Sequence, residues 1–501
     1  MNNVLEYLEE SVKKYPQKTA VIDENSSCSY EELYDHAQRI GSFLSRNNSL
    51  IKPVAVLMEK SVEALTSFMG IVSAGCFYSF ISPDQPTSRI DQILTVLNPA
   101  CIISSVEWSQ TLKTLSFQGE IYDYQMLIKT PILIEHLRSI RDRTLDIHPL
   151  YCNFTSGSTG IPKGVLVSHR SVIDFMEYFP DMFHITKDDI LGNQAPFDFD
   201  VSVKDIYSAF KTGATAVLIP KKLFSMPALL IDFLCDHHIT TLIWAVSALC
   251  MVTQLKGFTY KIPVCVNKVL FSGEAMPASH LTNWQKHLPH AQFVNLYGPT
   301  EITCNCTYYP ILRVFEPEET IPIGTPFPNE RVFLLGTNDA LIKEEGETGE
   351  ICVSGTALAL GYYNNPEQTK KAFVQNPLNP HYPEIIYRTG DLAFYNKNGD
   401  LCFAGRKDFQ IKYMGHRIEL EEIELVLNSY AQINRACCTF DTKTNRISAF
   451  YCGELDKKEL MKRMRDTLPP YMIPGRFIPV REIPVTANGK MDRKKLLEMN
   501  L

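Results

Sequence analysis

The sequence predicts an α/β fold: a large N-terminal domain of parallel and mixed sheets flanked by helices, with a small antiparallel subdomain, and then a small α+β domain at the C-terminus. Three observations predict it. Strand-like and helix-like runs alternate through the first two thirds of the chain. From about residue 320, short strands follow one another between Gly, Asn and Asp turns. The length of 501 residues has room for about three domains or subdomains.

The alternating region contains two strand–helix–strand units and further short strands. The expected elements cover residues 54–58, 61–74 and 76–81, then 215–219, 226–237 and 240–244, and finally 268–271 and 292–295. Alternation of this kind predicts parallel sheets that bind ligands at the carboxyl ends of their strands.

The predicted pattern of secondary structure changes in the last third of the chain. Antiparallel strands are expected at 331–335, 350–354 and 399–403. A helix that begins near Glu419, a polar strand pair and a helix at 456–467 are expected to form the C-terminal domain.

We expect a domain boundary at residues 406–408. The core then covers residues 1–405, with its antiparallel subdomain at about 320–405, and the C-terminal domain covers 409–501.

The composition is that of an ordinary globular protein, with 45% hydrophobic residues and a net charge of −7. No long basic run occurs and aromatic residues are not interleaved with Lys or Arg, so we expect no nucleic-acid partner. The 14 cysteines are scattered and form no CxxC pair. Free, reduced thiols in a cytoplasmic protein are the expectation.

The only stretch that suggests a membrane span is residues 64–83, which carry no charge. The stretch holds two glycines, four serines and a terminal proline, and it divides better into a helix and a buried strand. The N-terminus lacks the basic start and apolar run of a signal peptide. We therefore expect no membrane insertion. We also expect the protein to be a monomer.

A glycine-rich loop at residues 155–164, Thr-Ser-Gly-Ser-Thr-Gly-Ile-Pro-Lys-Gly, is the strongest local signal. Its glycines let successive N–H groups face an anion, and its hydroxyls and lysine add donors. The spacing is not that of a Walker A loop. A flexible surface turn is the alternative, which the strand-like run 150–154 before the loop makes weaker.

Six more motifs follow this loop in order. They are Asn-Gln-Ala-Pro-Phe-Asp-Phe-Asp-Val-Ser-Val (193–203), Ser-Gly-Glu-Ala (272–275), Asn-Leu-Tyr-Gly-Pro-Thr-Glu (295–301), Tyr-Arg-Thr-Gly-Asp (387–391), Gly-Arg-Lys-Asp-Phe-Gln-Ile-Lys (405–412) with Gly-His-Arg-Ile-Glu (415–419), and Asn-Gly-Lys (488–490). Together they resemble the adenylate-forming superfamily, specifically amino-acid adenylation domains of nonribosomal peptide synthetases. The chain looks most similar to stand-alone D-alanine–carrier protein ligases.

The resemblance implies an ATP site. Its residues are Thr155, Ser156, Gly157, Ser158, Thr159, Gly160 and Lys163 in the loop, Gly273, Glu274, Ala275, Asn295 and Tyr297 around the adenine, and Asp391 and Arg406 at the ribose. We expect Asp391 to follow a strand in a tight Thr-Gly turn, where a carboxylate can accept both ribose hydroxyls.

The chemical step joins two anions, a carboxylate and the α-phosphate of ATP, so charge screening and positioning should dominate it. Mg²⁺ prefers hard oxygen ligands; Glu301 can supply one, and Thr300 can donate its hydroxyl to the α-phosphate. The alternative for Glu301 is a role in capping a helix. By resemblance, Lys490 bridges the substrate carboxylate and the α-phosphate. A solvated surface lysine is its alternative.

The resemblance also implies a second half-reaction. Asp408 corresponds to a hinge about which a mobile C-terminal domain swings. Lys412 and Gly415 would then face the site, where a glycine lets a pantetheine arm pass close to the backbone.

The substrate pocket is implied by a further set of positions. Asp200 matches the aspartate that pairs with the substrate's ammonium group, with Asp198 and Asp205 as competing candidates. The side-chain pocket corresponds to Val201, Lys204, Ser247, Leu270, Ser272, Leu296, Cys304 and Asn305.

This pocket lining is mixed and fairly polar. Ser272 stands where cysteine is expected in a D-alanine ligase, which puts D-alanine in doubt. Lys204 either points inward, where it attracts an acidic or polar side chain, or outward as a solvated helix lysine. Alanine, serine and an acidic amino acid all remain open.

The resulting hypothesis is an ATP- and Mg²⁺-dependent ligase that makes an aminoacyl-adenylate with release of pyrophosphate. It then transfers the aminoacyl group to the phosphopantetheine thiol of a carrier protein. No carrier motif follows Lys490, so we expect a separate carrier protein unless the sequence is a piece of a larger synthetase. An acyl-CoA or aryl-acid ligase is one alternative. A non-catalytic nucleotide sensor is the other.

Overall fold

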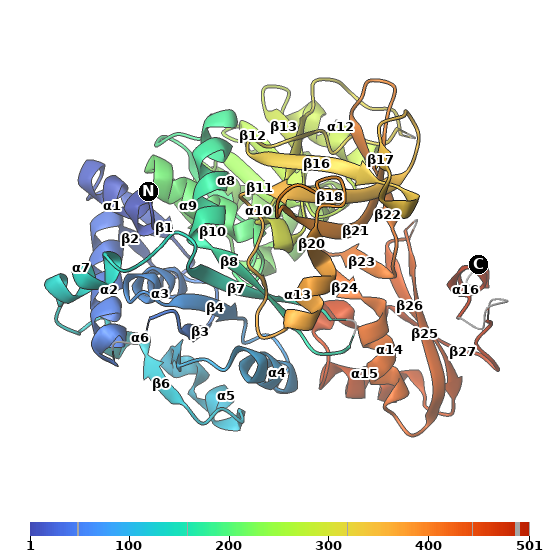
Figure 1. Ribbon diagram of the computed structural model, residues 1–501, viewed down its shortest axis with the longest axis horizontal. Helices are drawn as coiled ribbons and strands as arrows, with labels where there is room; N and C mark the ends of the chain where they lie inside the picture. The colour runs from blue at the N-terminus through green and yellow to red at the C-terminus, as the bar shows by residue number, and fades with distance from the viewer. Residues whose placement is uncertain (48–49, 158, 318, 443, 486–490, 500–501) are drawn as a thin grey trace.

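The computed structural model describes residues 1–47, 50–157, 159–317, 319–442, 444–485 and 491–499. Figure 1 shows the first helices and strands on the left, an antiparallel sheet at the upper right and the C-terminal part at the lower right. The arrangement confirms the predicted fold class.

A mixed sheet of nine strands forms one side of the N-terminal part. Its middle six strands, from β13 to β1, are parallel, and the strands at both edges are antiparallel to their neighbours. In sheet order the strands are β15 (Thr325–Pro326), β14 (Thr307–Pro310), β13 (Gln292–Tyr297), β12 (Lys268–Ser272), β11 (Thr241–Ala245), β9 (Ile190–Asn193), β10 (Thr215–Leu218), β1 (Thr19–Ile22) and β2 (Ser27–Ser29).

A second mixed sheet has seven strands. Five are parallel, and an antiparallel hairpin at one edge carries the glycine-rich loop between β7 and β8. In sheet order the strands are β19 (Gly361–Tyr362), β8 (Lys163–Ser168), β7 (Pro149–Thr155), β4 (Phe77–Ile81), β3 (Pro53–Leu57), β5 (Cys101–Ser104) and β6 (Glu120–Asp123).

The antiparallel sheet has six strands, as the turn-rich sequence predicts. They are β17 (Leu341–Ile342), β16 (Glu330–Leu335), β18 (Gly349–Gly355), β21 (Ile385–Tyr395) and β20 (Phe373–Gln375), with β22 (Leu401–Arg406) paired to β21. The register of β21 and β22 sets Asp391 opposite Arg406.

Two small sheets make up the C-terminal part. One is the hairpin of β23 (Gln410–Tyr413) and β24 (His416–Glu419); the other contains β25 (Ile433–Asp441), β26 (Arg446–Gly453) and β27 (Arg476–Pro479). The strand pair that we expected to be polar is buried on both faces. Helices α14 and α15 pack on one face in their own apolar core, and Cys437 and Phe450 on the other face pack with Leu496 of α16.

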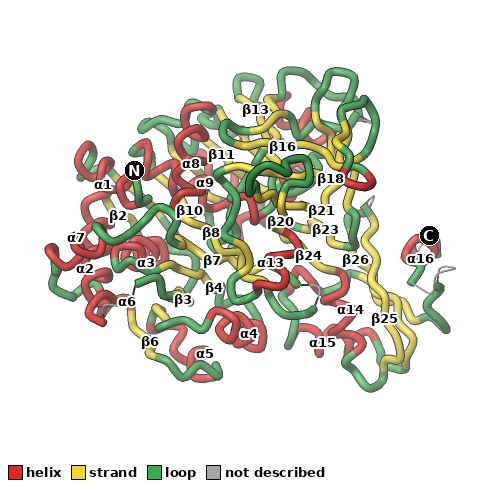
Figure 2. The backbone as a smooth tube through the Cα atoms, viewed as in Figure 1, coloured by secondary structure: helices red, strands yellow, loops and turns green. Residues whose placement is uncertain are grey.

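Helices cover the sheets, as the tube in Figure 2 shows in red. They are α1 (Leu5–Lys14), α2 (Tyr30–Leu44), α3 (Val62–Ser73), α4 (Thr87–Leu97), α5 (Ser109–Thr114), α6 (Tyr124–Leu127), α7 (Ile134–Arg141), α8 (His169–Met182), α9 (Val201–Thr212), α10 (Pro227–Asp236), α11 (Val246–Gln254), α12 (Ala278–His287), α13 (Pro366–Ala372), α14 (Leu420–Asn428), α15 (Lys457–Arg465) and α16 (Arg493–Glu498).

The largest core includes residues of the seven- and nine-stranded sheets together with the buried faces of α2, α3, α8 and α9. Residues 64–83 carry no charge because α3 is buried along almost its whole length and β4 is an interior strand. Ser61 begins α3 by accepting a hydrogen bond from the Ala64 amide. In the described part of the chain, every helix is too short or too polar to span a bilayer.

Candidate active site

One cavity collects residues from motifs that are far apart in the sequence. It lies at the carboxyl ends of the parallel strands, where the glycine-rich hairpin, the antiparallel sheet and the β23–β24 hairpin meet (Figure 1). Of the residues predicted from sequence, it is lined by Thr155, Ser156, Asp200, Val201, Ser272, Gly273, Thr300, Cys304, Asp391, Arg406, Lys412 and Gly415.

The predicted ribose residues form a connected group. Asp391 is fully buried; it accepts a hydrogen bond from the Tyr297 hydroxyl at 2.6 Å and contacts the Arg406 guanidinium. The prediction that Asp391 lies in a turn after a strand is wrong. The residue lies within β21, because Gly390 before it has positive φ and forms an irregularity that the strand passes through.

Arg406 also forms an ion pair with Asp408, the predicted hinge residue. Its Nε and Nη2 donate to the two carboxylate oxygens of Asp408 at 2.7 and 2.8 Å. Burial raises the pKa of Asp408, but the charge and hydrogen bonds of Arg406 outweigh this and lower it overall. The ion pair thus fixes Asp408, the second residue beyond the antiparallel sheet.

The glycine-rich loop is a tight hairpin in which Thr155 pairs with Lys163. A Cβ on Gly157 would lie 2.1 Å from the Ile161 carbonyl oxygen, so only glycine fits there. Lys163 is buried and its Nζ lies 3.3 Å from Glu419. Thr159 and Gly160 lie in the turn, and Ser158 lies outside the described residues.

Glu301 is completely buried, in a short 3₁₀ helix (Thr300–Ile302). It accepts a hydrogen bond from the Tyr362 hydroxyl at 2.7 Å, and Nη1 of Arg417 lies 2.8 and 2.7 Å from its two oxygens. Burial raises its pKa, but the charges of Arg417 and Lys163 prevail and lower it to about 2. Glu301 is therefore an ionised oxygen donor and not a helix cap.

The protein's possible metal ligands fit a magnesium ion that is held mainly by the phosphates of the substrate. Among the described residues, no three His, Cys, Asp or Glu side chains are grouped as a metal site. Mg²⁺ commonly takes one or two protein carboxylates and completes its shell with phosphates and water. One ionised carboxylate, Glu301, beside the glycine-rich loop meets that requirement.

Asp200 is a buried carboxylate in the wall of the cavity, with Thr300 and Lys204 nearby. It is 7% exposed and precedes α9 without capping it, and its Oδ2 has no hydrogen-bond partner among the described residues. Burial raises its pKa to about 6. The two competing carboxylates also each keep one oxygen without a hydrogen-bond partner in the described chain, while Asn193 donates to Asp205 at 2.8 Å and Gln85 donates to Asp198 at 3.2 Å. Asp198 lines the cavity as Asp200 does, and Asp205 does not.

Lys204 points inward, which decides between the two orientations considered from sequence. The side chain is fully buried, and its Nζ donates to Asn305 Oδ1 at 2.7 Å and to Ser272 Oγ at 3.2 Å. Burial lowers its pKa. Ser272, to which the lysine donates, and Cys304 line the cavity, and the charge of Asp200 acts on the lysine.

The other predicted pocket and adenine residues named here do not line the cavity themselves. Leu270 and Leu296 belong to the main apolar core. Asn295 donates to the Pro322 carbonyl oxygen at 2.8 Å. Glu274 accepts a hydrogen bond from the Gly415 amide at 2.6 Å, and Ser247 contacts the same glutamate.

The β23–β24 hairpin brings Lys412 and Gly415 into the cavity. The Lys412 Nζ lies 3.9 Å from Asp391 Oδ2 and 5.0 Å from the centre of the Tyr297 ring. Gly415 has a φ of 79°, and a Cβ there would lie 3.3 Å from the Ala245 side chain. The hairpin therefore packs tightly into the site.

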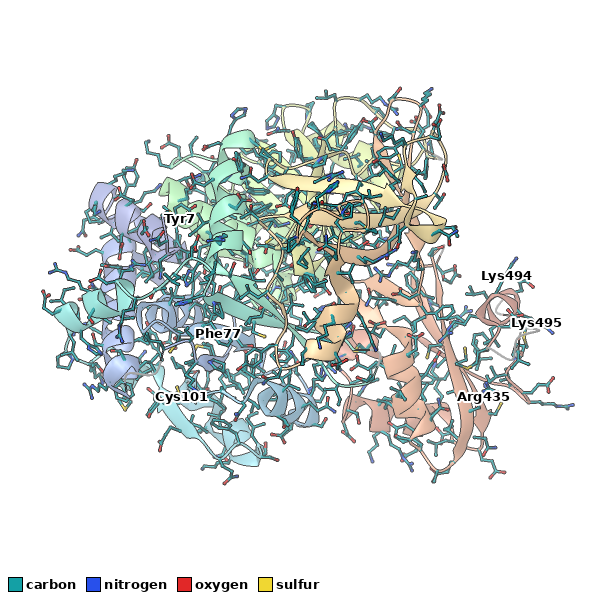
Figure 3. All side chains as sticks on the ribbon, in the orientation of Figure 1. Tyr7, Phe77, Cys101, Arg435, Lys494 and Lys495 are labelled. Atoms are coloured by element: carbon teal, nitrogen blue, oxygen red, sulfur yellow. The ribbon has the colours of Figure 1, made fainter. Side chains whose placement is uncertain are left out.

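Lys490 lies outside the described residues. Val485 and Met491, the described residues on either side of its segment, form an isolated bridge, and Met491 packs on the outer core beside α16. Figure 3 shows Lys494 and Lys495 on α16, at the far edge of the molecule from the N-terminal part.

Sequence reasoning assigned no role to several residues that contact the site. Arg417 and Glu419 belong to a motif that had been recognised, so their proximity could have been suspected. Arg89 of α4, which pairs with Glu422, had no motif signal, and neither did Tyr362.

Two family models match this chain, one in its N-terminal part and one in its C-terminal part. A family model described as AMP-binding enzyme matches residues 8–363, and one described as AMP-binding enzyme C-terminal domain matches residues 422–490. Tyrocidine synthase 3 of Brevibacillus parabrevis is 33% identical over 500 residues, which are 98% of this chain and 7% of that protein. The chain therefore spans a small part of that relative.

Two solved structures share the fold. The adenylation domain AlmE of Vibrio cholerae, in complex with glycyl-adenosine-5'-phosphate, has a TM-score of 0.86 and 23% identity, over 99% of this chain and 97% of that chain. PA1221, a nonribosomal peptide synthetase (NRPS) protein containing adenylation and PCP domains, has a TM-score of 0.83 and 23% identity, over 99% and 84%.

Proposed function

The chain belongs to the AMP-binding enzyme family, and from that membership we propose that it is an amino-acid–carrier protein ligase. The first half-reaction joins an amino acid to the α-phosphate of ATP and releases pyrophosphate. The second transfers the aminoacyl group to the phosphopantetheine thiol of a separate carrier protein. Family membership confirms the resemblance found in the motifs; the closer likeness to D-alanine ligases stays a prediction.

The unpartnered carboxylate oxygen of Asp200 carries this proposal. One oxygen of this buried carboxylate has no hydrogen-bond partner in the described chain, which is costly, and a substrate ammonium group would lower that cost. An aryl or fatty acid has no such group, so the observation favours an amino acid over the acyl-CoA and aryl-acid alternative. The glycyl-adenosine-5'-phosphate bound by AlmE is consistent with this chemistry.

We assign the first half-reaction as follows. Asp391 and Arg406 hold the ribose, and the loop with Lys163 holds the phosphates. Glu301 would hold Mg²⁺, which screens the charge between the two reacting anions. Lys490 bridges the carboxylate and the α-phosphate, and Thr300 donates to the latter.

The pose of the C-terminal part supports a second half-reaction. Lys412 and Gly415 line the cavity, while the described residues flanking Lys490 lie on the outer face of that part. A rotation about residues 406–408 that exchanges the two segments fits a two-step enzyme. PA1221, which combines adenylation and PCP domains, makes a carrier protein the natural second substrate.

We propose an amino acid with a short acidic side chain. When the substrate ammonium group neutralises Asp200, the buried charge of Lys204 loses its nearest compensation. A side-chain carboxylate restores it, and a serine hydroxyl does so less well, because only the carboxylate carries charge. Aspartate or glutamate is therefore expected ahead of serine, and alanine last.

Amino-acid-dependent ATP–pyrophosphate exchange tests the proposal across the standard amino acids, D-alanine and D-serine. Strong exchange with one or two of them, lost in Lys490→Ala, is the expected result. Exchange with none of them, from folded protein that binds ATP, would make the Asp200 assignment the first to abandon.

A further inference from the structure

We propose that Thr303 is a positioning residue for the amino-acid pocket, held by a hydrogen bond from its hydroxyl to the Ala357 carbonyl. The bond keeps a strained turn in the wall of the cavity, and the turn places the next two side chains where they can select the substrate. This role rests on the proposed function, which makes Lys204 part of the selectivity. It adds the residue that controls where the partner of Lys204 lies.

The turn follows directly after Glu301, and two successive residues in it adopt left-handed backbone without being glycine. Thr303 has a φ of 51° and Cys304 a φ of 72°. Left-handed backbone crowds Cβ against the neighbouring carbonyl, and a branched Cβ increases the crowding, so threonine rarely adopts it. Such a conformation persists only where surrounding contacts enforce it, and conformations of this kind cluster at binding and catalytic sites.

Contacts around the turn enforce its conformation. Thr303 is completely buried, and its Oγ1 donates to the Ala357 carbonyl oxygen at 2.7 Å. Gly298 packs on the same turn, because a Cβ there would come within 2.5 Å of the Asn305 Cα. In the described chain neither Thr303 nor Ala357 lines the cavity, so the hydroxyl ties the turn to a part of the molecule outside the pocket.

The two residues after Thr303 reach the pocket. Cys304 lines the cavity, and its Sγ donates to the Asp200 carbonyl oxygen at 3.2 Å. Asn305 Oδ1 accepts the hydrogen bond from Lys204 at 2.7 Å. Ordinary backbone angles at the turn would direct both side chains elsewhere, because a backbone rotation moves every atom beyond it. Thr303 therefore acts on the substrate through Cys304 and Asn305 without touching it.

The support at the other end of this bond is itself fixed. Ala357 lies in the segment 356–360, between β18 and β19, and its amide donates to Glu330 Oε1 at 2.9 Å. Two residues further on, the amide of Ala359 donates to the carbonyl oxygen of Glu301 at 2.8 Å. The same segment therefore holds the start and the middle of the turn. A short segment bound at several points is a rigid reference for the pocket wall.

Thr303→Val tests this role, because valine removes the hydroxyl and keeps the size and the branched Cβ. ATP–pyrophosphate exchange is measured with aspartate, glutamate, serine and alanine. The KM for the best of the four should rise at least about tenfold, while the KM for ATP stays within about twofold. The preference for that amino acid over the second best should fall at least about fivefold. Thr303→Ser retains the donor and should keep all three quantities within about twofold of wild type.

A double-mutant cycle with Lys204→Met shows whether Thr303 acts through the lysine. In the Lys204→Met background, Thr303→Val should change the same preference by less than about twofold, because the cation whose partner the turn positions is gone. A threonine with a merely structural role would lower activity toward both amino acids equally, and would do so in either background.

Thr66→Val is the matched control. Thr66 is buried in α3, its hydroxyl donates to the Val62 carbonyl oxygen at 2.8 Å, and it does not line the cavity. The variant loses the same kind of hydrogen bond and should change neither KM nor the preference. Melting curves establish that each variant is folded. If Thr303→Val does not fold, Thr303→Gly provides the test, because glycine adopts positive φ without strain and also lacks the hydroxyl.

The outcomes separate the two proposals. An unchanged KM and an unchanged preference in Thr303→Val overturn the role of Thr303 and leave the proposed function intact. An equal loss with the two amino acids, or an equal change of preference in both backgrounds, also overturns that role. Wild-type protein that shows exchange with no amino acid overturns the proposed function as well.

Discussion

Two opposite charges, Asp200 and Lys204, lie one helical turn apart at the start of α9. We expect them to determine which substrate the pocket binds. Asp200 and Lys204 are both buried, and burial disfavours the ionised form of each. Each also favours ionisation of the other. A zwitterion with an acidic side chain satisfies both charges at once, as the proposed substrate does.

Amino-acid binding should depend on pH through Asp200. Burial raises the pKa of its carboxyl group to about 6, and only the ionised form attracts an ammonium group. The KM for the amino acid should therefore be constant above pH 6 and rise about tenfold per pH unit below it. Exchange measured from pH 5 to 8 checks this. A KM that does not change with pH would remove Asp200 as the ammonium partner.

Lys204→Met should change the preferred substrate from an acidic amino acid to an apolar one. Loss of the buried cation leaves a substrate carboxylate unpaired, and kcat/KM for the acidic amino acid should fall at least about a hundredfold. The melting temperature should fall by several degrees without loss of the fold, because the buried Asp200 loses a compensating charge and Asn305 Oδ1 loses its donor. Exchange kinetics with aspartate, glutamate and alanine, together with a melting curve, measure both effects. Undiminished use of the acidic amino acid would contradict the assignment.

At the scale of elements, the glycine-rich hairpin depends on its tight geometry. Gly157→Ala brings a Cβ within 2.1 Å of the Ile161 carbonyl oxygen, so the loop must open. We expect exchange activity to fall at least about tenfold through a higher KM for ATP, because the loop amides no longer converge. The melting temperature should move by only a few degrees, since the change is local. Normal ATP kinetics in this variant would show that the loop does not bind the phosphates.

The elements themselves were largely predictable from sequence. Interior strands such as β3 and β4 are short, wholly apolar runs, and turn residues bound the antiparallel strands. The prediction that β25 and β26 are polar failed because their faces are covered by helices that come before and after them in the chain. A strand's own residues do not reveal what will pack on it.

The orientation of Lys204 could not be predicted for a related reason. Helix α9 is buried from Val201 to Phe210, so no exposed face gives the sequence a helical period from which to infer direction. The ion pair of Arg89 and Glu422 joins residues 333 positions apart. No local pattern anticipates such a contact, although both ends of it help to fill the site.

At the scale of the whole molecule, the N-terminal and C-terminal parts have separate apolar cores and meet through polar contacts at the site. Three of these contacts connect Glu301 with Arg417, Lys163 with Glu419 and Glu274 with Gly415. Polar contacts of this kind can be exchanged for ligand contacts, whereas an interdigitated apolar core cannot. The division into a core and a mobile C-terminal domain remains a proposal that a dynamic measurement can test.

Hydrogen exchange of backbone amides is that measurement. The amides of Gly415 and Glu419 donate to side chains across the site, to Glu274 and to Ser156, so they are protected only in the present pose. Mg²⁺ with α,β-methylene-ATP should speed exchange in peptides covering 410–422 by at least about tenfold, whereas AMP should leave them protected. Peptides from β16 and β18, which pair with each other within the antiparallel sheet, serve as the internal reference. Equal protection of 410–422 with both nucleotides would mean that the triphosphate and the β23–β24 hairpin share the site, and that the two half-reactions do not require the C-terminal part to move.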